Sequence, residues 1–480
     1  MRKKEYNVGS GSLFNNKTNL NKQIARRRNI MNSIGATGGV EYLRSLSQTN
    51  TSQAASQTSQ AAMPTIPSDP QDQMDFISSL KADSVDGKVK LIINADSKES
   101  LEELKQNITK KGAEKQITAD LPLINGIAVE VDEEQLGILP QLNKLGTDFH
   151  VWKDGRISIP DPIIETQQPE TRMDIAPVTL GVDKLWEAGL TGKGSTICVI
   201  DTGIAQHPDL KDRIVGFKDF VNGKTEAYDD QGHGTHCAGI AAGDGGETGK
   251  YKGTAPEASI VGVKVLDRNG SGNFSDVIKG IQWAIENKEK FGIDVISMSL
   301  GGPVTQPSAK DPVSLAAEKA TEAGIITVVA AGNEGPRPKT IGTPGNAENV
   351  ITIGAMDDRG TVSRDDDKLA YFSSIGPTKF DERVKPDILA PGVNITAASH
   401  SGSGYVTMSG TSMATPFAAG VMALAAQAKP GIDPTELKEA AKGCADPLPQ
   451  QNLTPNHQGK GVIDPVSLIN TIAPEFNIEA

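Results

Sequence analysis

The chain has 480 residues, which is enough for two or three domains with sizeable cores. Charged residues make up 22% of it, and no stretch approaches the roughly 18 consecutive apolar residues of a membrane helix. The formal net charge of −12 argues against general nucleic-acid binding, although residues 1–30 carry eight basic side chains and one acidic side chain. We therefore expect a globular protein with no membrane span and no nucleic-acid partner.

Residues 1–75 are predicted to form a polar, disordered arm that is first basic and then rich in Ser and Gln. Between residues 45 and 68 there is no charged side chain, and the tract has too little apolar surface to offset the entropy of ordering. The charged start is not followed by the apolar segment of a secretory signal, so we expect a cytoplasmic or non-classically exported protein. The three cysteines are too few for a disulfide framework.

Residues 86–158 are predicted to form a small α+β domain. Apolar side chains alternate at 89, 91 and 93 and again at 127, 129 and 131, as in strands, whereas Leu101, Leu104 and Ile108 have helical spacing. A second helix is predicted from 132 and a strand from 149. With one further strand, we expect the complete order to be βαββαβ, which is ferredoxin-like. The next stretch, 159–178, contains four prolines and is predicted to be an exposed linker.

Residues 179–475 are predicted to form an α/β domain with three layers. Apolar runs at 195–201, 259–266, 294–300 and 325–332 are separated by helical patterns. Strands that are apolar on both faces indicate a parallel sheet covered by helices on both sides. Sites in such sheets lie in the loops after the carboxyl ends of the strands, and Asp201, Ser299 and Asn333 are at such ends.

Four side chains of this domain supply what acyl transfer to a serine requires. Asp201 ends a strand, His233 lies between two glycines at a helix start, and Ser412 opens a helix of small residues with Pro416 expected near its first turn, where a missing N–H costs least. A serine hydroxyl is a poor nucleophile until a neighbouring base takes its proton. Backbone N–H groups at the Ser412 helix and the side-chain amide of Asn333 can stabilise an oxyanion.

These residues also have simpler interpretations. An Asp after a strand is most often a turn or cap residue, and a Ser at a helix start is usually an N-cap. His233 and His236 have the spacing of a metal-binding pair, but no third ligand follows at a recognisable spacing. Cys237 is either a nucleophile in its own right or, like Cys198, a small core residue.

The four motifs together narrow these alternatives. They are D-T-G at 201–203, H-G-T-H-C-A-G at 233–239, A-A-G-N-E-G at 330–335 and G-T-S-M-A-T-P at 410–416. From about 180 to 445 the chain resembles the subtilisin-like serine proteases (subtilases, peptidase family S8). The resemblance implies that Asp201 orients His233, that His233 is the general base, that Ser412 is the nucleophile, and that Asn333 stabilises the oxyanion with the Ser412 N–H. The rival interpretation is a catalytically silent binding or scaffold protein that retains the fold.

The resemblance also implies how a polypeptide substrate is held. Two extended segments would take the substrate between them as an added strand: Gly270, Ser271 and Gly272, and Ser299, Leu300 and Gly301. Phe274, Val277 and Leu300 would line a pocket for an apolar residue upstream of the cut. Gly342 would leave the primary pocket open, so we expect broad specificity that favours large apolar residues at the cut.

The small domain resembles the inhibitor-type propeptide of the same family. The resemblance implies a zymogen whose own propeptide is an intramolecular inhibitor, with its tail in the cleft, and which cleaves itself within about 156–175. The alternative is a small domain that merely stays attached.

The implied chemistry requires no cofactor, and the resemblance adds only a structural calcium ion. Asp209 in HPDL matches a calcium ligand of the family. The loop at 243–253 lacks the usual Asn-rich form and contains Lys250 and Lys252, which count against calcium at that place.

Overall fold

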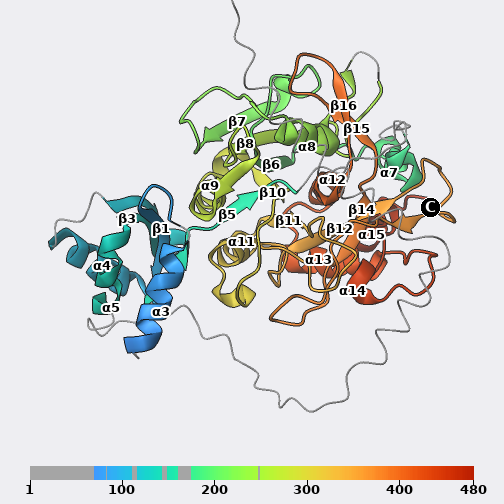
Figure 1. Cartoon of the computed structure of the whole chain (residues 1–480). Helices are drawn as coiled ribbons and strands as arrows, with labels where there is room; N and C mark the ends of the chain where they lie inside the picture. Colours follow the sequence, from blue (N-terminus) through green and yellow to red (C-terminus); the bar gives the residue numbers. More distant parts are fainter. Residues whose placement is uncertain are drawn as a thin grey trace, which may run out of the picture. The chain divides into compact units, whose positions relative to one another are not determined.

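The computed structural model describes residues 70–82, 84–110, 116–142, 149–160, 175–246 and 249–479. Residues 1–69 of the predicted arm and 161–174 of the predicted linker, with most of the expected self-cleavage region, lie outside these ranges. Figure 1 shows a small sheet that contains β1 and β3 and a larger sheet that contains β6, β8 and β10. Among the helices of the described ranges, none is long and apolar enough to pass through a bilayer.

The small domain is built on an antiparallel sheet in the order β2-β3-β1-β4. Its elements are α3 (Pro70–Lys81), β1 (Lys88–Ala95), α4 (Lys98–Lys110), β2 (Ile117–Leu121), η2 (Pro122–Ile124), β3 (Gly126–Asp132), η3 (Glu133–Ile138), α5 (Leu139–Leu142) and β4 (Phe149–Lys153). Helix α3 was not predicted and begins within the range assigned to the arm. Because Leu80 of α3 is buried in the core of this domain, the domain begins before the predicted boundary at 86.

Both faces of the small sheet are buried. Leu91 and Ile93 of β1 belong to one apolar cluster with Leu104 of α4. Ile92 of the same strand belongs to a second cluster, which contains Val313 of α11 (Pro312–Glu322) in the larger domain. Since neighbouring residues of a strand face opposite sides of the sheet, the apolar residue at 92 marks the face that the larger domain covers.

The larger domain contains a sheet in the order β13-β12-β11-β10-β6-β8-β7, with β14 beside β12. The pairings are parallel except for β12 with β13. The strands are β6 (Thr196–Asp201), β7 (Ile214–Asp219), β8 (Ser259–Lys264), β10 (Ile293–Met298), β11 (Ile326–Ala330), β12 (Ile351–Asp357), β13 (Lys368–Leu369) and β14 (Ile388–Pro391).

Helices cover both faces of this sheet. On one face, α8 (His233–Ala242) and α12 (Thr411–Ala428) share an apolar cluster with Val199 of β6. On the other face, α9 (Phe274–Glu286) and α11 share a cluster with Ile200 of the same strand. This arrangement confirms the predicted three-layer α/β fold.

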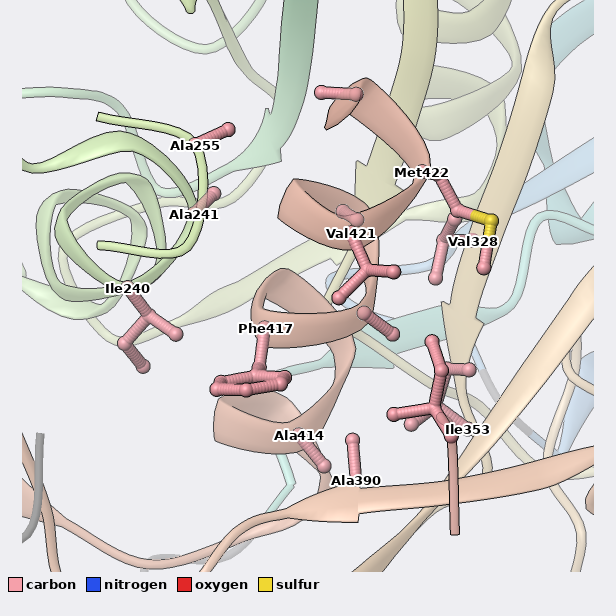
Figure 2. Packing of buried hydrophobic residues seen from close by; sticks show 14 of the residues in the cluster. Ile240, Ala241, Ala255, Val328, Ile353, Ala390, Ala414, Phe417, Val421 and Met422 are labelled. Atoms are coloured by element: carbon pink, nitrogen blue, oxygen red, sulfur yellow. The ribbon is translucent and has the colours of Figure 1, made fainter. Parts of the chain in front are cut away.

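Helix α12 is the centre of the first face. Figure 2 shows it between Ile240 and Ala241 of α8 on one side and Val328 and Ile353 of the sheet on the other. A Cβ at Gly420 would lie 2.5 Å from the Cβ of Thr254, so this close packing requires a glycine there. The position of Ser412, near the start of α12, is therefore set by a large apolar contact.

The remaining elements are shorter and lie around this framework. They are β5 (Arg156–Ser158), α6 (Ala176–Thr179), α7 (Val182–Glu187), η5 (Lys211–Arg213), β9 (Ser271–Asn273), α10 (Lys288–Phe291), η7 (Ser308–Lys310), β15 (Ile395–Ala398), β16 (Tyr405–Met408), α13 (Pro434–Cys444), α14 (Pro455–Gln458) and α15 (Pro465–Ile472). Strands β15 and β16 form an antiparallel pair, as do β5 and β9.

Candidate active site

Asp201 and His233 come from neighbouring elements and share a buried contact. Asp201 is the last residue of β6, and His233 is the first residue of α8. Nδ1 of His233 lies 2.8 Å from Oδ1 and 3.0 Å from Oδ2 of Asp201, so Nε2 is left as the second, basic ring nitrogen. Burial lowers the pKa of His233, but the Asp201 carboxylate and Cys237 together raise it by more, and the pKa lies well above its ordinary value of 6.5.

Thr202 and Asp229 hold the start of α8 against β6, and the sequence analysis identified neither. The Thr202 hydroxyl donates to Oδ1 of Asp229 (3.0 Å) and accepts from the N–H of Gly234 (2.9 Å). Asp229 also accepts from the N–H groups of Gly232 (2.8 Å) and Thr235 (3.0 Å). A carboxylate at a helix N-terminus is stabilised by the helix dipole as well. The only sequence signal was their position: Thr202 is the middle residue of the D-T-G motif, and Asp229 lies four residues before His233.

The backbone carbonyl of Ser412, the second residue of α12, accepts side-chain donors. Pro416 has no N–H and cannot make the helical bond to this carbonyl. The Ser299 hydroxyl (2.9 Å) and the Cys237 thiol (3.4 Å) donate to it instead. The expectation that Pro416 lies near the first turn was wrong because the helix begins at Thr411. The Ser412 hydroxyl itself donates to the Ser299 carbonyl at 3.3 Å.

The contacts of Cys237 favour a small core residue over a nucleophile. Its side chain is buried, and burial raises the pKa of its thiol. Its sulfur lies 3.8 Å from Nδ1 of His233, which is the nitrogen that already faces Asp201. A base acting on this thiol would have to give up the Asp201 contact.

The histidines do not form a metal pair. Nε2 of His236 bonds to the Val406 carbonyl at 2.9 Å, and burial lowers the pKa of His236 to about 4. Within the described ranges, the one group of three potential ligands with atoms within 4.8 Å of each other is Asp201, His233 and Cys237. Two of them, Asp201 and His233, form the acid–base contact described above, and Cys237 packs beside it.

Asn333 lies after β11 with its amide group in a fixed orientation. Its Oδ1 accepts from the N–H (3.0 Å) and the hydroxyl (2.9 Å) of Thr411. The Nδ2 donor therefore turns away from Thr411. A Cβ at Gly410 would lie 3.1 Å from this Nδ2 and 3.6 Å from the Ser412 nitrogen, so the glycine leaves open a space beside two N–H donors. Such a space suits an oxyanion.

One cavity joins these groups. His233, Asn333 and Ser412 line it together, and its volume is about 600 Å³. Gly270 and Ser271 of the first predicted substrate segment line it as well, and so do Ser158, Ile159 and Pro160, which follow the small domain in the chain. The structure thus brings the three separate motifs and the end of the small domain to one place.

Both predicted substrate segments are hydrogen-bonded to the chain that follows the small domain. Strand β5 pairs antiparallel with β9, where Ile157 is opposite Gly272. Ser158 donates to the Gly301 carbonyl (3.1 Å) and accepts from the Gly301 N–H (2.9 Å), and Ile159 donates to the Gly270 carbonyl (2.9 Å). The chain therefore lies between the two segments as an added strand, the geometry expected of a bound polypeptide.

The side chain of Ile157 fills an apolar pocket. It is 1% exposed and belongs to the apolar cluster that contains Phe274, Val277 and Leu300, the three residues predicted for such a pocket. Gly342 is not among the residues that line the cavity; its N–H donates to the Ala331 carbonyl (3.2 Å).

Asp209, the predicted calcium ligand, accepts hydrogen bonds in the described part of the chain. Both carboxylate oxygens of Asp209 accept from the Tyr405 hydroxyl (3.2 and 3.0 Å), and its backbone carbonyl accepts from Arg213. Burial raises the pKa of Asp209. Calcium needs six to eight oxygen ligands, and a structural calcium ion at Asp209 stays a prediction.

Comparisons with known proteins agree with this geometry. The profile of the subtilase family matches residues 192–461. The serine protease AprX of Bacillus subtilis is 50% identical over 294 residues, which cover 57% of this chain and 66% of AprX. Subtilisin DY of Bacillus licheniformis is 37% identical over 285 residues, which cover 59% of this chain and 93% of that protein.

One further relative also aligns with the small domain. M-protease of Shouchella clausii is 32% identical over 402 residues, which cover 81% of this chain and 93% of M-protease. Since 81% of 480 residues is about 389, and 480 − 389 = 91, that alignment begins no later than about residue 92. It therefore includes most of the strands of the small domain.

Proposed function

Because the chain belongs to the subtilase family of serine endopeptidases, which act on polypeptides, we propose that Asp201, His233 and Ser412 are its catalytic triad. The observation that carries the proposal is the contact between Nδ1 of His233 and Asp201 beside a cavity that Ser412 also lines. The contact fixes the imidazole so that Nε2 is the basic nitrogen.

The chemistry proceeds through an acyl-enzyme. The Ser412 oxygen attacks the substrate carbonyl carbon while its proton passes to Nε2 of His233. The carbon–nitrogen bond then breaks as Nε2 returns the proton to the leaving amine. Water, deprotonated by the same nitrogen, hydrolyses the ester and restores the Ser412 hydroxyl. Nδ2 of Asn333 and the Ser412 N–H stabilise the oxyanion in both halves of the reaction.

The small domain acts as an inhibitory propeptide, so the chain is made as a zymogen. The backbone pairing of Ser158 with Gly301 and the burial of Ile157 support this role, because both use the surfaces assigned to substrate. Self-cleavage within about 156–175 would release the propeptide.

Specificity is broad because backbone pairing holds the substrate. An apolar residue would enter the pocket that Ile157 occupies, and a large apolar residue is favoured at the cut. The support for the first preference is the packing of Ile157. The second preference rests on the family resemblance alone, because Gly342 does not line the cavity.

N-terminal sequencing of the purified protein tests the proposal. Wild type should acquire a new N-terminus between residues 156 and 175, whereas the Ser412→Ala variant should keep the precursor terminus. Processing of both proteins at the same bond would mean that another protease makes the cut, and an unprocessed, inactive wild type would contradict the zymogen.

A further inference from the structure

The register of the strand in the cleft identifies the residue that reaches the nucleophile. Ser158 and Gly301 exchange both of their backbone hydrogen bonds, so they form a hydrogen-bonded antiparallel pair. In such a ladder the next hydrogen-bonded pair lies two residues further along each chain. That pair would be Pro160 with Ser299. Its donor would be the N–H of residue 160 and its acceptor the carbonyl of Ser299.

Proline cannot complete this pair. Pro160 has no N–H, so the Ser299 carbonyl receives no bond from the strand at this register. The Ser412 hydroxyl occupies that acceptor instead, at 3.3 Å. Pro160 nevertheless lines the same cavity as His233 and Ser412, so the chain does reach the reacting groups.

We propose that Pro160 is a built-in brake on cleavage of the propeptide. The proposal rests on the proposed function. A substrate residue with an N–H at this position would bond to the Ser299 carbonyl, which would fix the following peptide bond and compete with the long bond from the Ser412 hydroxyl, so that this hydroxyl turns toward His233 more readily. The missing N–H prevents both, while the pairs at Ser158 and Ile159 keep the strand bound. The strand is then held as an inhibitor and cut slowly at the bond after residue 160.

Three peptides separate the missing N–H from the other properties of proline. They are succinyl-Arg-Ile-Ser-Ile-X-p-nitroanilide with X as proline, alanine or N-methylalanine, assayed with the mature wild-type enzyme. N-methylalanine lacks the N–H but has no ring. Since one hydrogen bond in the reacting complex corresponds to about a tenfold change in the cleavage rate, the alanine peptide should be cleaved at least about tenfold faster than the other two.

The full-length precursor provides a second measurement. Pro160→Ala should accelerate the appearance of an N-terminus at residue 161 at least about tenfold, as followed by mass spectrometry, whereas Pro455→Ala at the start of α14 should not change it. Equal rates for all three peptides, or an N-methylalanine peptide cleaved as fast as the alanine peptide, would overturn the proposal. An enzyme that cleaves neither these peptides nor casein would contradict the proposed function and this inference with it.

Discussion

The two sheets of the molecule are buried in different ways. Helices α8, α9, α11 and α12 cover the larger sheet, and all of them belong to the same domain. The small sheet has its own helices on one face only, and its other face, with Ile92 and Trp152, packs in a cluster with α9 and α11. The larger domain therefore carries its site on its own core, whereas one face of the small sheet depends on the surface of the larger domain.

The polar contacts between the domains are few and specific. The indole of Trp152 donates to Gln306 (2.9 Å), and the Asp154 carboxylate accepts from the N–H (2.8 Å) and the hydroxyl (2.6 Å) of Ser275 at the start of α9. Burial raises the pKa of Asp154. Together with β5, these contacts orient the small domain on the larger domain. The apolar face of the small sheet supplies the buried apolar surface between the two domains.

The largest expected effect tests whether the larger domain carries the chemistry alone. In the mature enzyme, His233→Ala should lower kcat by about 10⁶-fold because the nucleophile loses its base, a magnitude known from subtilisin rather than derived from this structure. Cys237→Ala is the matched control and should stay within about tenfold of wild type, since Cys237 is taken to be a core residue. Peptide hydrolysis that survives His233→Ala but not Cys237→Ala would indicate a cysteine hydrolase.

The oxyanion site gives the next largest effect. Asn333→Ala should lower kcat by about 10²- to 10³-fold with little change in KM, again the magnitude known for the corresponding donor of subtilisin. Asn333→Asp keeps the contacts with Thr411 but replaces the donor by an acceptor, so it should lose at least as much. Steady-state kinetics on a chromogenic peptide would show this, and a loss confined to KM would contradict an oxyanion role.

The dependence of the small domain on the apolar pocket predicts a smaller effect. In the inactive Ser412→Ala precursor, Ile157→Ala should weaken the strand by about 2 kcal/mol or more, because it removes a buried side chain. Amide hydrogen exchange at Ser158 and Gly301 should accelerate by about 30-fold. Val178→Ala, at an exposed site of the larger domain, is the control. Unchanged protection at Ser158 would show that the pocket does not hold the propeptide.

The smallest effect concerns pH. His233 must be neutral to act as a base, and its pKa is raised above 6.5, so protonation inactivates the enzyme at higher pH than for an ordinary histidine. Below this pKa, kcat/KM should fall about tenfold for each pH unit, and above it kcat/KM should become constant. A pH–rate profile of the mature enzyme that is already constant at pH 6 would contradict the raised pKa.

The sequence was sufficient to predict those features of the fold and the site that follow from local patterns. The α/β architecture follows from strands that are apolar on both faces, and Asp201, His233 and Ser412 could be named because each lies at or next to the end of an element. Helix α3 could have been found, since its apolar residues Phe76, Ile77 and Leu80 have the spacing of one helix face.

The remaining features depend on contacts between distant residues. The bond between Thr202 and Asp229 and the replacement of the Pro416 N–H by Ser299 and Cys237 join different elements, and no local pattern indicates them. The contact of Ile92 with the larger domain could not be predicted either. An apolar residue on the outer face of a strand indicates that this face is buried, but not which domain covers it.

Covalent labelling with a fluorophosphonate probe tests the central claim most directly. The account predicts that mature wild type is labelled, that the probe maps to Ser412 by peptide mass spectrometry, and that Ser412→Ala is not labelled. The unprocessed precursor should be labelled much more slowly, since its own strand lies in the cleft. A folded mature wild type that takes no label, or a label that persists in Ser412→Ala, would contradict the assignment of this site.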